Sequence, residues 1–205
     1  VESYQSLFLK AHYPLEFMVG VINNFGGFYR TEYYVHEARM AGATIHPPCI
    51  NQSEILTGIK GTDIFLGLGL IAELEQQLIA DLLNERERNG NFLGLHDVAK
   101  RVRVSGTQLR LLIRVGAFRF TGQSKKELLW ETHFSGHKKS NTIIALFQYE
   151  EKNLNLPKFQ DHWIEDAYDE MELFEFPLKN PFDLIDYFPI TPVANKLQDL
   201  VGKNV

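Results

Sequence analysis

Two groups of side chains in this sequence have residue types and a spacing that could suit metal binding. His46 and Cys49 flank two prolines, and both residue types bind zinc. A zinc site needs three or four ligands, however, and no second pair stands at a suitable spacing. We therefore interpret His46 and Cys49 as loop residues without a catalytic role.

A second group of candidates lies near the C-terminal end, where carboxylates recur three and four residues apart, as in Asp166, Asp169 and Glu170. Such oxygens could bind a divalent cation. A run of this kind is more often the solvated face of a helix, and we favour that interpretation. The sequence shows no nucleophile elbow, phosphate loop or Cys/His pair, so it does not present a complete catalytic site.

The composition is that of a soluble globular protein. The chain has 205 residues, of which 44% are hydrophobic and 23% charged, enough for one or two domains. No apolar run approaches the roughly 20 residues of a membrane span, and the N-terminal residues do not resemble a signal peptide. Cys49 is the only cysteine, so no intrachain disulfide can form. We expect a cytoplasmic protein without a membrane partner.

Charge is distributed unevenly along the chain, whose net charge is -5. Residues 94–126 carry eight Lys or Arg and one acid, a net charge of +7, whereas residues 161–187 carry nine acids and one base, a net charge of -8. A basic block of this kind can present a positive face to phosphate groups despite the total charge. From clustering alone, solvated helix faces are the favoured alternative.

The spacing of apolar residues predicts a mainly α fold with short extended segments. Pro14 fits the first turn of a helix that follows a break, and a helix is expected from about Leu70 to Arg88. Residues 101–118 predict a helical hairpin with its turn at Ser105-Gly106-Thr107. In a helix-hairpin-helix unit, turn amides and the next helix N-terminus bind phosphate without regard to base sequence. An ordinary helical hairpin is the equal alternative.

Five phrases follow one another along the chain: SYQSLFLKAHYPLEFMVGVINN, YYVHEARMAGATIHPPCINQSE, IFLGLGLI, LRLLIRVGAF and MELFEFPLKNPFDLI. In this order they resemble segments of the alpha subunit of bacterial DNA polymerase III, a C-family polymerase. The last is similar to the family's Leu-Gly-Phe signature, with Asn180 in place of a histidine. GGFY and KKELLWE are more similar to the error-prone branch of the family.

The resemblance implies a fragment that runs from the end of the fingers, through a tandem helix-hairpin-helix region, to an acidic helical connector before an OB-fold. The parent would be a DNA-directed DNA polymerase (a nucleotidyltransferase) that uses magnesium. Its palm aspartates would precede Val1, so this fragment is expected to need no cofactor and to be inactive alone. The implied segments are fingers and crossing loop, 1–61, hairpins, 62–120, linker, 121–160, and connector, 161–205.

The first of the two hairpins departs from the family pattern. Where the family has Lys-Gly-apolar-Gly, this sequence has Ala72, Glu73, Leu74 and Glu75. Both turn glycines and the lysine are missing, and carboxylates repel phosphate. We therefore expect the first hairpin to be retained for packing and to have weakened or lost DNA contact.

The resemblance assigns sites residue by residue. DNA contact is expected at residues 101–114, with a further contact from the fingers: Arg101, Arg103, Ser105, Gly106, Thr107, Arg110, Arg114, Lys10 and His12. Leu146 and Phe147 match the apolar anchors of an internal sliding-clamp peptide, although Ile143 replaces its glutamine; a core strand is the alternative. Expected partners are DNA phosphates, the sliding clamp and other holoenzyme subunits. A competing hypothesis is a scaffold with degenerate hairpins that binds only proteins.

Overall fold

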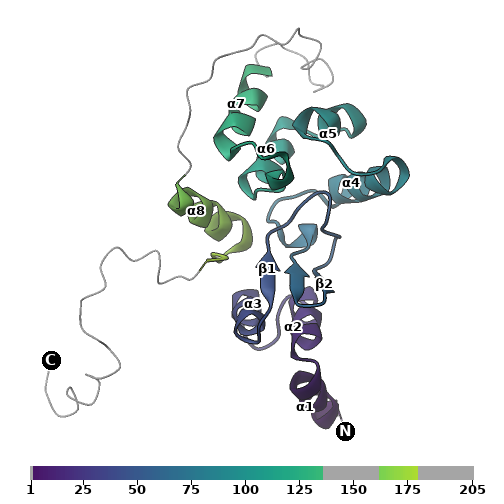
Figure 1. Ribbon diagram of the computed structural model, residues 1–205, viewed down its shortest axis with the longest axis vertical. Coiled ribbons are helices and arrows are strands. Elements are labelled where there is room, and N and C mark those ends of the chain that lie inside the picture. Colours follow the sequence, from purple (N-terminus) through teal and green to yellow (C-terminus); the bar gives the residue numbers. More distant parts are fainter. Residues whose placement is uncertain (1, 136–161, 180–205) are drawn as a thin grey trace, which may run out of the picture.

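The computed structural model describes residues 2–135 and 162–179 (Figure 1). The described part is mainly α, as predicted, with a small three-stranded sheet between two groups of helices. The elements, in chain order, are α1 Glu2–His12, α2 Pro14–Asn23, α3 Thr31–Met40, β1 Thr44–His46, β2 Gly58–Lys60, β3 Asp63–Phe65, η1 Leu68–Leu70, α4 Gln76–Asn89, α5 Leu95–Arg101, α6 Gly106–Arg114, η2 Arg119–Thr121, α7 Lys125–Ser135 and α8 Trp163–Phe174.

The N-terminal helices and the sheet form the lower part of the molecule in Figure 1. Pro14 stands in the first turn of α2, as predicted, because its fixed φ suits a helix start and its missing N–H is not needed there. β3 is the central strand, parallel to β1 and antiparallel to β2. Met18 of α2, Ala38 of α3 and Ile64 of β3 are buried together, which attaches this sheet to both helices.

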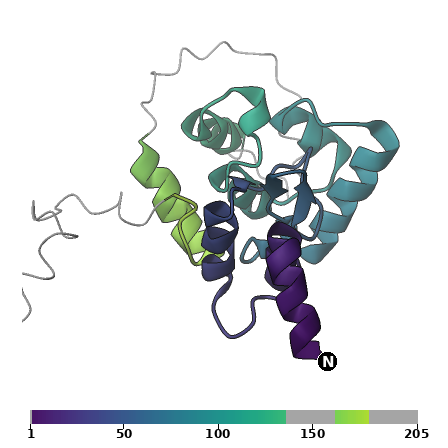
Figure 2. The same ribbon diagram turned by 60° about the horizontal axis from the view of Figure 1, so that its bottom comes forward.

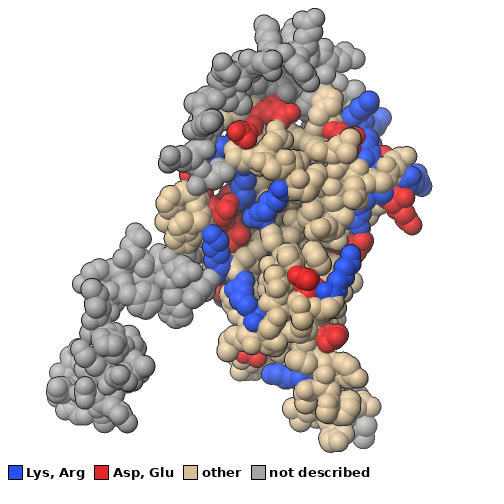
Figure 3. All heavy atoms as spheres, viewed as in Figure 1, with Lys and Arg blue, Asp and Glu red and all other residues tan. Residues whose placement is uncertain are grey.

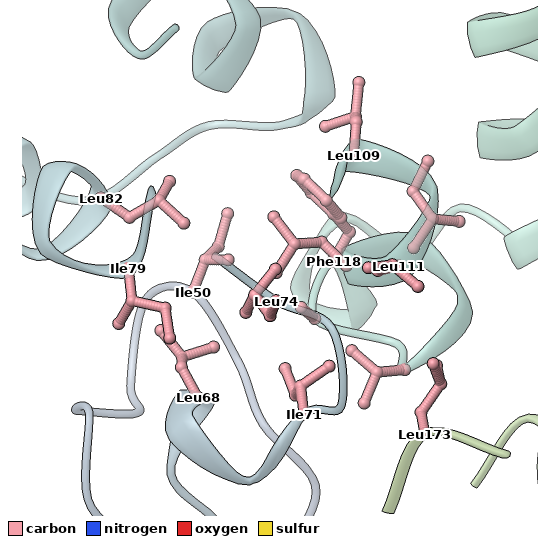
Figure 4. Packing of buried hydrophobic residues seen from close by; sticks show 14 of the residues in the cluster. Ile50, Leu68, Ile71, Leu74, Ile79, Leu82, Leu109, Leu111, Phe118 and Leu173 are labelled. Atoms are coloured by element: carbon pink, nitrogen blue, oxygen red, sulfur yellow. The ribbon is translucent and has the colours of Figure 1, made fainter. Parts of the chain in front are cut away.

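The main core lies among α4, α5, α6 and α8. Figure 4 shows side chains from η1, α4, α6 and α8 directed toward one another, and α5 adds Leu95 and Val98 to the same cluster. Leu82, Leu112 and Ile113 are fully buried, and Leu173 of α8 is 3% exposed. The turn after α8 also contacts α3, where the Arg39 guanidinium donates a hydrogen bond to the Leu178 carbonyl (Figure 2). α8 is therefore an integral part of the packed structure.

The prediction of a helix from about Leu70 to Arg88 was wrong about where the helix begins. η1 ends at Leu70, a turn follows at residues 71–75, and α4 begins only at Gln76. Glu73 in this turn has a φ of +61°, a left-handed conformation that a helix does not contain. Apolar residues such as Ile71 and Leu74 continue the helical spacing through residues 71–75, but they pack into the core from a turn and not from a helix.

The glycines before this turn have a packing role. A Cβ atom on Gly67 would lie 2.5 Å from the Leu56 carbonyl carbon and 2.6 Å from the Ile55 carbonyl oxygen. The Gly69 amide donates to that same Ile55 oxygen over 2.9 Å. Only a residue without a side chain permits this approach, so these glycines bring two backbone segments together.

Candidate nucleic-acid interface

The second hairpin consists of α5, the turn at residues 102–105 and α6. The turn predicted at Ser105-Gly106-Thr107 was placed too late, because Ser105 caps α6 and Gly106 and Thr107 lie in its first turn. Val102 and Val104 of the turn are buried, so Arg103 between them faces outward. The Ser105 hydroxyl caps α6 by accepting a hydrogen bond from the Gln108 amide at 3.2 Å. The remaining amides of this first turn have no acceptor within the helix, which gives the turn positive potential.

Exposed cations stand beside this first turn. Arg103 and Arg110 are exposed, and neither has an ion-pair partner among residues 2–135 and 162–179. The Arg110 guanidinium lies 3.4 Å from the Thr107 hydroxyl oxygen, to which it donates. Ser105 and Thr107 are exposed and Gly106 is half-buried. The turn thus combines hydroxyls, amides and two available guanidinium groups on one surface.

Arg101, another predicted contact, is held inside the protein. It pairs with Glu85 at 2.9 Å and with Asp97 at 3.1 Å, and it donates to the backbone carbonyls of Glu85, Gly90 and Asn91. Its guanidinium also lies 4.4 Å from the centre of the Phe92 ring. The hydrogen bond from Arg101 lowers the pKa of the Glu85 carboxyl. Arg101 therefore fastens the end of α4 to α5.

Arg114 is also paired within the protein. Its guanidinium contacts Asp169 at 2.7 Å and forms a double hydrogen bond with Glu172, both on α8. The bond to Glu172 is the main cause of a raised Arg114 pKa, and it lowers the pKa of the Glu172 carboxyl. Lys125 of α7 contacts Asp166 of α8 at 2.6 Å. The acidic helix thus neutralises one side of the basic block.

The turn of the first hairpin, at residues 71–75, is closed by hydrogen bonds within the chain. The buried Gln108 side chain accepts from the Glu75 amide at 2.9 Å and donates to the Glu73 carbonyl at 2.9 Å. The Ala72 amide donates to the Leu173 carbonyl at 2.8 Å. Side-chain and backbone oxygens therefore already bind turn amides that could otherwise bind phosphate oxygens. No sequence pattern indicated this role for Gln108.

The remaining predicted residues lie apart from the second hairpin. Lys10 and His12 are exposed in the last turn of α1, at the end of the molecule opposite α5 in Figure 1. The His12 ring lies 4.3 Å from the Phe8 ring, centre to centre. Leu146 and Phe147 lie outside the described residues.

The metal-ligand candidates His46, Asp166 and Asp169 have charged partners within the chain. His46 pairs with Asp63 at 2.6 Å, and within the described ranges no group of three or more His, Cys, Asp or Glu could hold a metal ion. The α8 carboxylates Asp166 and Asp169 contact Lys125 instead, which leaves them poorly suited to a cation. None of the described helices is both long and apolar enough to cross a membrane.

Comparison with known proteins connects this geometry to a family. A helix-hairpin-helix family model matches residues 42–128. The chain is 35% identical over 130 residues to an error-prone DNA polymerase of Mycobacterium bovis, and 35% identical over 131 residues to a DNA polymerase III subunit alpha of Staphylococcus aureus. A DNA polymerase III subunit alpha of Mycobacterium tuberculosis is 31% identical over 130 residues.

These alignments cover 62% of this chain but only 11–12% of the relatives, so the chain spans a small part of their length. The similarity extends to both the replicative and the error-prone polymerases, and the helix-hairpin-helix match contains α4, α5 and α6. The chain is thus similar to a small part of bacterial DNA polymerase III alpha subunits and error-prone DNA polymerases, and it carries a match to the helix-hairpin-helix motif.

Proposed function

We propose that this chain is a non-catalytic segment of a bacterial DNA polymerase III alpha subunit or error-prone polymerase. In this proposal it binds the DNA backbone, without regard to base sequence, during DNA-templated DNA synthesis. The supporting observation is the second hairpin, where exposed Arg103 and Arg110 flank the first turn of α6 without an acidic partner among the described residues.

The proposed contact is a phosphate group against the start of α6. Amides of Gly106 and Thr107 and the Ser105 hydroxyl would donate to its oxygens, and the flanking arginines would neutralise its charge. Such contacts carry no sequence information, which suits a polymerase that must bind any template.

Arg101 and Arg114 have supporting roles in this proposal. Carboxylates already bind both guanidinium groups, and breaking those pairs would leave partly buried acids without a cation. Lys10 and His12 remain candidates for a separate contact with nucleic acid or nucleotide, since both are exposed at the end of α1.

We extend the proposal to the whole protein from its relatives. It would be a DNA polymerase whose magnesium is held by residues outside this chain, and this chain would correspond to the fingers end, hairpins, linker and connector. Sliding-clamp binding at Leu146 and Phe147 and contact with other holoenzyme subunits are parts of the same proposal.

A scaffold that binds only protein partners is the second candidate. It is favoured by the first hairpin, where Gln108 and the Leu173 carbonyl already bind turn amides. The candidates differ in one measurable property, because only phosphate contacts release counterions and therefore weaken steeply with salt.

Fluorescence anisotropy with a labelled duplex of mixed sequence, over a series of salt concentrations, tests the proposal. Arg103→Glu/Arg110→Glu should abolish or strongly weaken binding, because it removes two phosphate contacts. Any binding that remains should have a slope of log K against log salt that is smaller by about 1.8. Arg30→Glu/Lys60→Glu is the matched control, with the same charge change at exposed residues far from the hairpin. Equal loss in both variants, or no wild-type binding at low salt, would refute the proposal.

A further inference from the structure

A polar hollow lies beside the second hairpin, between α4 and the turn at residues 102–105. Its volume is about 280 Å³, room for several water molecules. Its lining includes Asn84 and Arg88 of α4 and Arg103 of the turn. The three side chains are exposed, and none has a hydrogen-bond or ion-pair partner within the described part of the chain.

Hydrogen bonds join the two walls of this hollow. Arg101 lines it and joins its two walls, because its guanidinium binds the Glu85 carboxylate and the Glu85 and Gly90 carbonyls at the α4 side. These bonds keep the end of α4 at a fixed separation from the hairpin. Arg88 and Arg103 are therefore held on opposite walls before any ligand arrives.

The charge of the lining favours an anion. The lining has three arginines and two acids, a net charge of +1: Arg101 is paired with Glu85, Asp81 accepts from Gln77 at 2.9 Å and keeps its charge, and Arg88 and Arg103 are the lining cations without an ion-pair partner among the described residues. Lys100, exposed on α5, adds a further cation nearby. Figure 3 shows Lys and Arg atoms along the edge that α4 and α5 form in this view, with Asp and Glu atoms among them.

We propose that this hollow binds a second backbone phosphate of the same DNA strand, with Arg88, Asn84 and Arg103 as its donors. Arg103 belongs both to the hollow and to the hairpin turn, so adjacent phosphates of one strand would lie across it. This inference rests on the proposed DNA binding and extends it onto α4, outside the hairpin turn itself. The Asn84 amide supplies a directional hydrogen bond, and Arg88 a guanidinium that binds phosphate through two donors.

Arg88→Ala tests the second phosphate. The variant should bind a duplex of mixed sequence more weakly at low salt, with a log-log slope smaller by about 0.9. The loss relative to wild type should therefore shrink about eightfold for each tenfold rise in salt. Arg88→Lys, which keeps the charge, should retain most of the slope, and Asn84→Ala should weaken binding without changing the slope.

Lys60→Ala is the matched control, an exposed charge on β2 far from the hollow. Because Arg88 has no hydrogen-bond or ion-pair partner within the described residues, its variants should unfold at the wild-type temperature, so a loss of binding reports on the surface itself. If Arg88→Ala behaves like Lys60→Ala while Arg103→Glu/Arg110→Glu loses binding, the second phosphate site is refuted and the hairpin contact stands. If the wild-type chain does not bind DNA, the proposed function fails, and this inference fails with it.

Discussion

The Gln108 side chain offers a direct test of how the two hairpins are joined. It is 7% exposed, and its amide group satisfies one donor and one acceptor of the first hairpin's turn, at Glu75 and Glu73. Gln108→Ala removes both hydrogen bonds and leaves a backbone amide and a carbonyl without partners in a poorly hydrated site.

The expected cost can be worked from these contacts. Two hydrogen bonds at about 1 kcal/mol each, with part of the penalty for unpaired groups, lower the free energy of unfolding by about 2–3 kcal/mol. For a chain of this size the melting temperature should fall by about 4–12 °C. Gln108→Glu should be at least as harmful, because a carboxylate cannot donate to the Glu73 carbonyl and would stand near two acids.

The assay is thermal unfolding followed by circular dichroism, with Gln77→Ala as the matched control. Gln77 is exposed on α4, and its side chain donates a hydrogen bond only to Asp81 within the described residues, so its removal should shift the midpoint by less than about 2 °C. An equally small shift for Gln108→Ala would refute the reasoning, since it would show that water or a relaxed backbone satisfies the turn without the side chain.

Three further outcomes follow from other contacts. Arg114→Gln leaves the α8 carboxylates without their cation, so its melting temperature should fall by a few degrees in low salt and by less in high salt. Burial raises the pKa of the Glu170 carboxyl, so the contribution of Glu170 to stability falls as the pH rises above the ordinary carboxyl pKa of 4.5. Glu170→Gln keeps an acceptor for the Leu178 amide. This variant should therefore have a higher melting temperature than wild type at neutral pH and an equal one in acid. Gly67→Ala should lower the melting temperature, because its Cβ would lie 2.5 Å from the Leu56 backbone.

Local signals in the sequence predicted that the second hairpin exists, but not the position of its turn, which ends at Ser105. Ser105 marks a helix start, and apolar residues at Leu109, Leu112 and Ile113 give α6 one buried face. The same spacing misled at the first hairpin, where Leu70, Leu74 and Leu78 continue a helical pattern through a turn. The left-handed conformation of Glu73 depends on hydrogen bonds to distant residues, which a sequence pattern does not contain.

The candidate site was predictable as a block of cations but not as individual contacts. Arg101, Arg103, Arg110 and Arg114 are equivalent in sequence, each on or beside the hairpin. Only tertiary contacts distinguish them: carboxylates bind Arg101 and Arg114, whereas Arg103 and Arg110 remain available to a ligand. Arg88 was missed because its partner in the proposed site, Arg103, lies across a hollow that forms only when α4 and the hairpin are fastened together.

The acidic helix α8 determines which cations of the basic block remain available to bind DNA. α8 is anchored to the core by Leu173 and Phe174, so its carboxylates are fixed opposite Arg114 and Lys125. A duplex approaching that side would meet cations that α8 carboxylates already bind, so these cations would contribute little to phosphate binding. The available cations stand instead along α4, α5 and the start of α6. In the proposed DNA binding, the position of α8 therefore determines from which side the duplex can approach. Substituting the α8 acids should allow the duplex to approach from the α8 side as well, without strengthening the contact at Arg103.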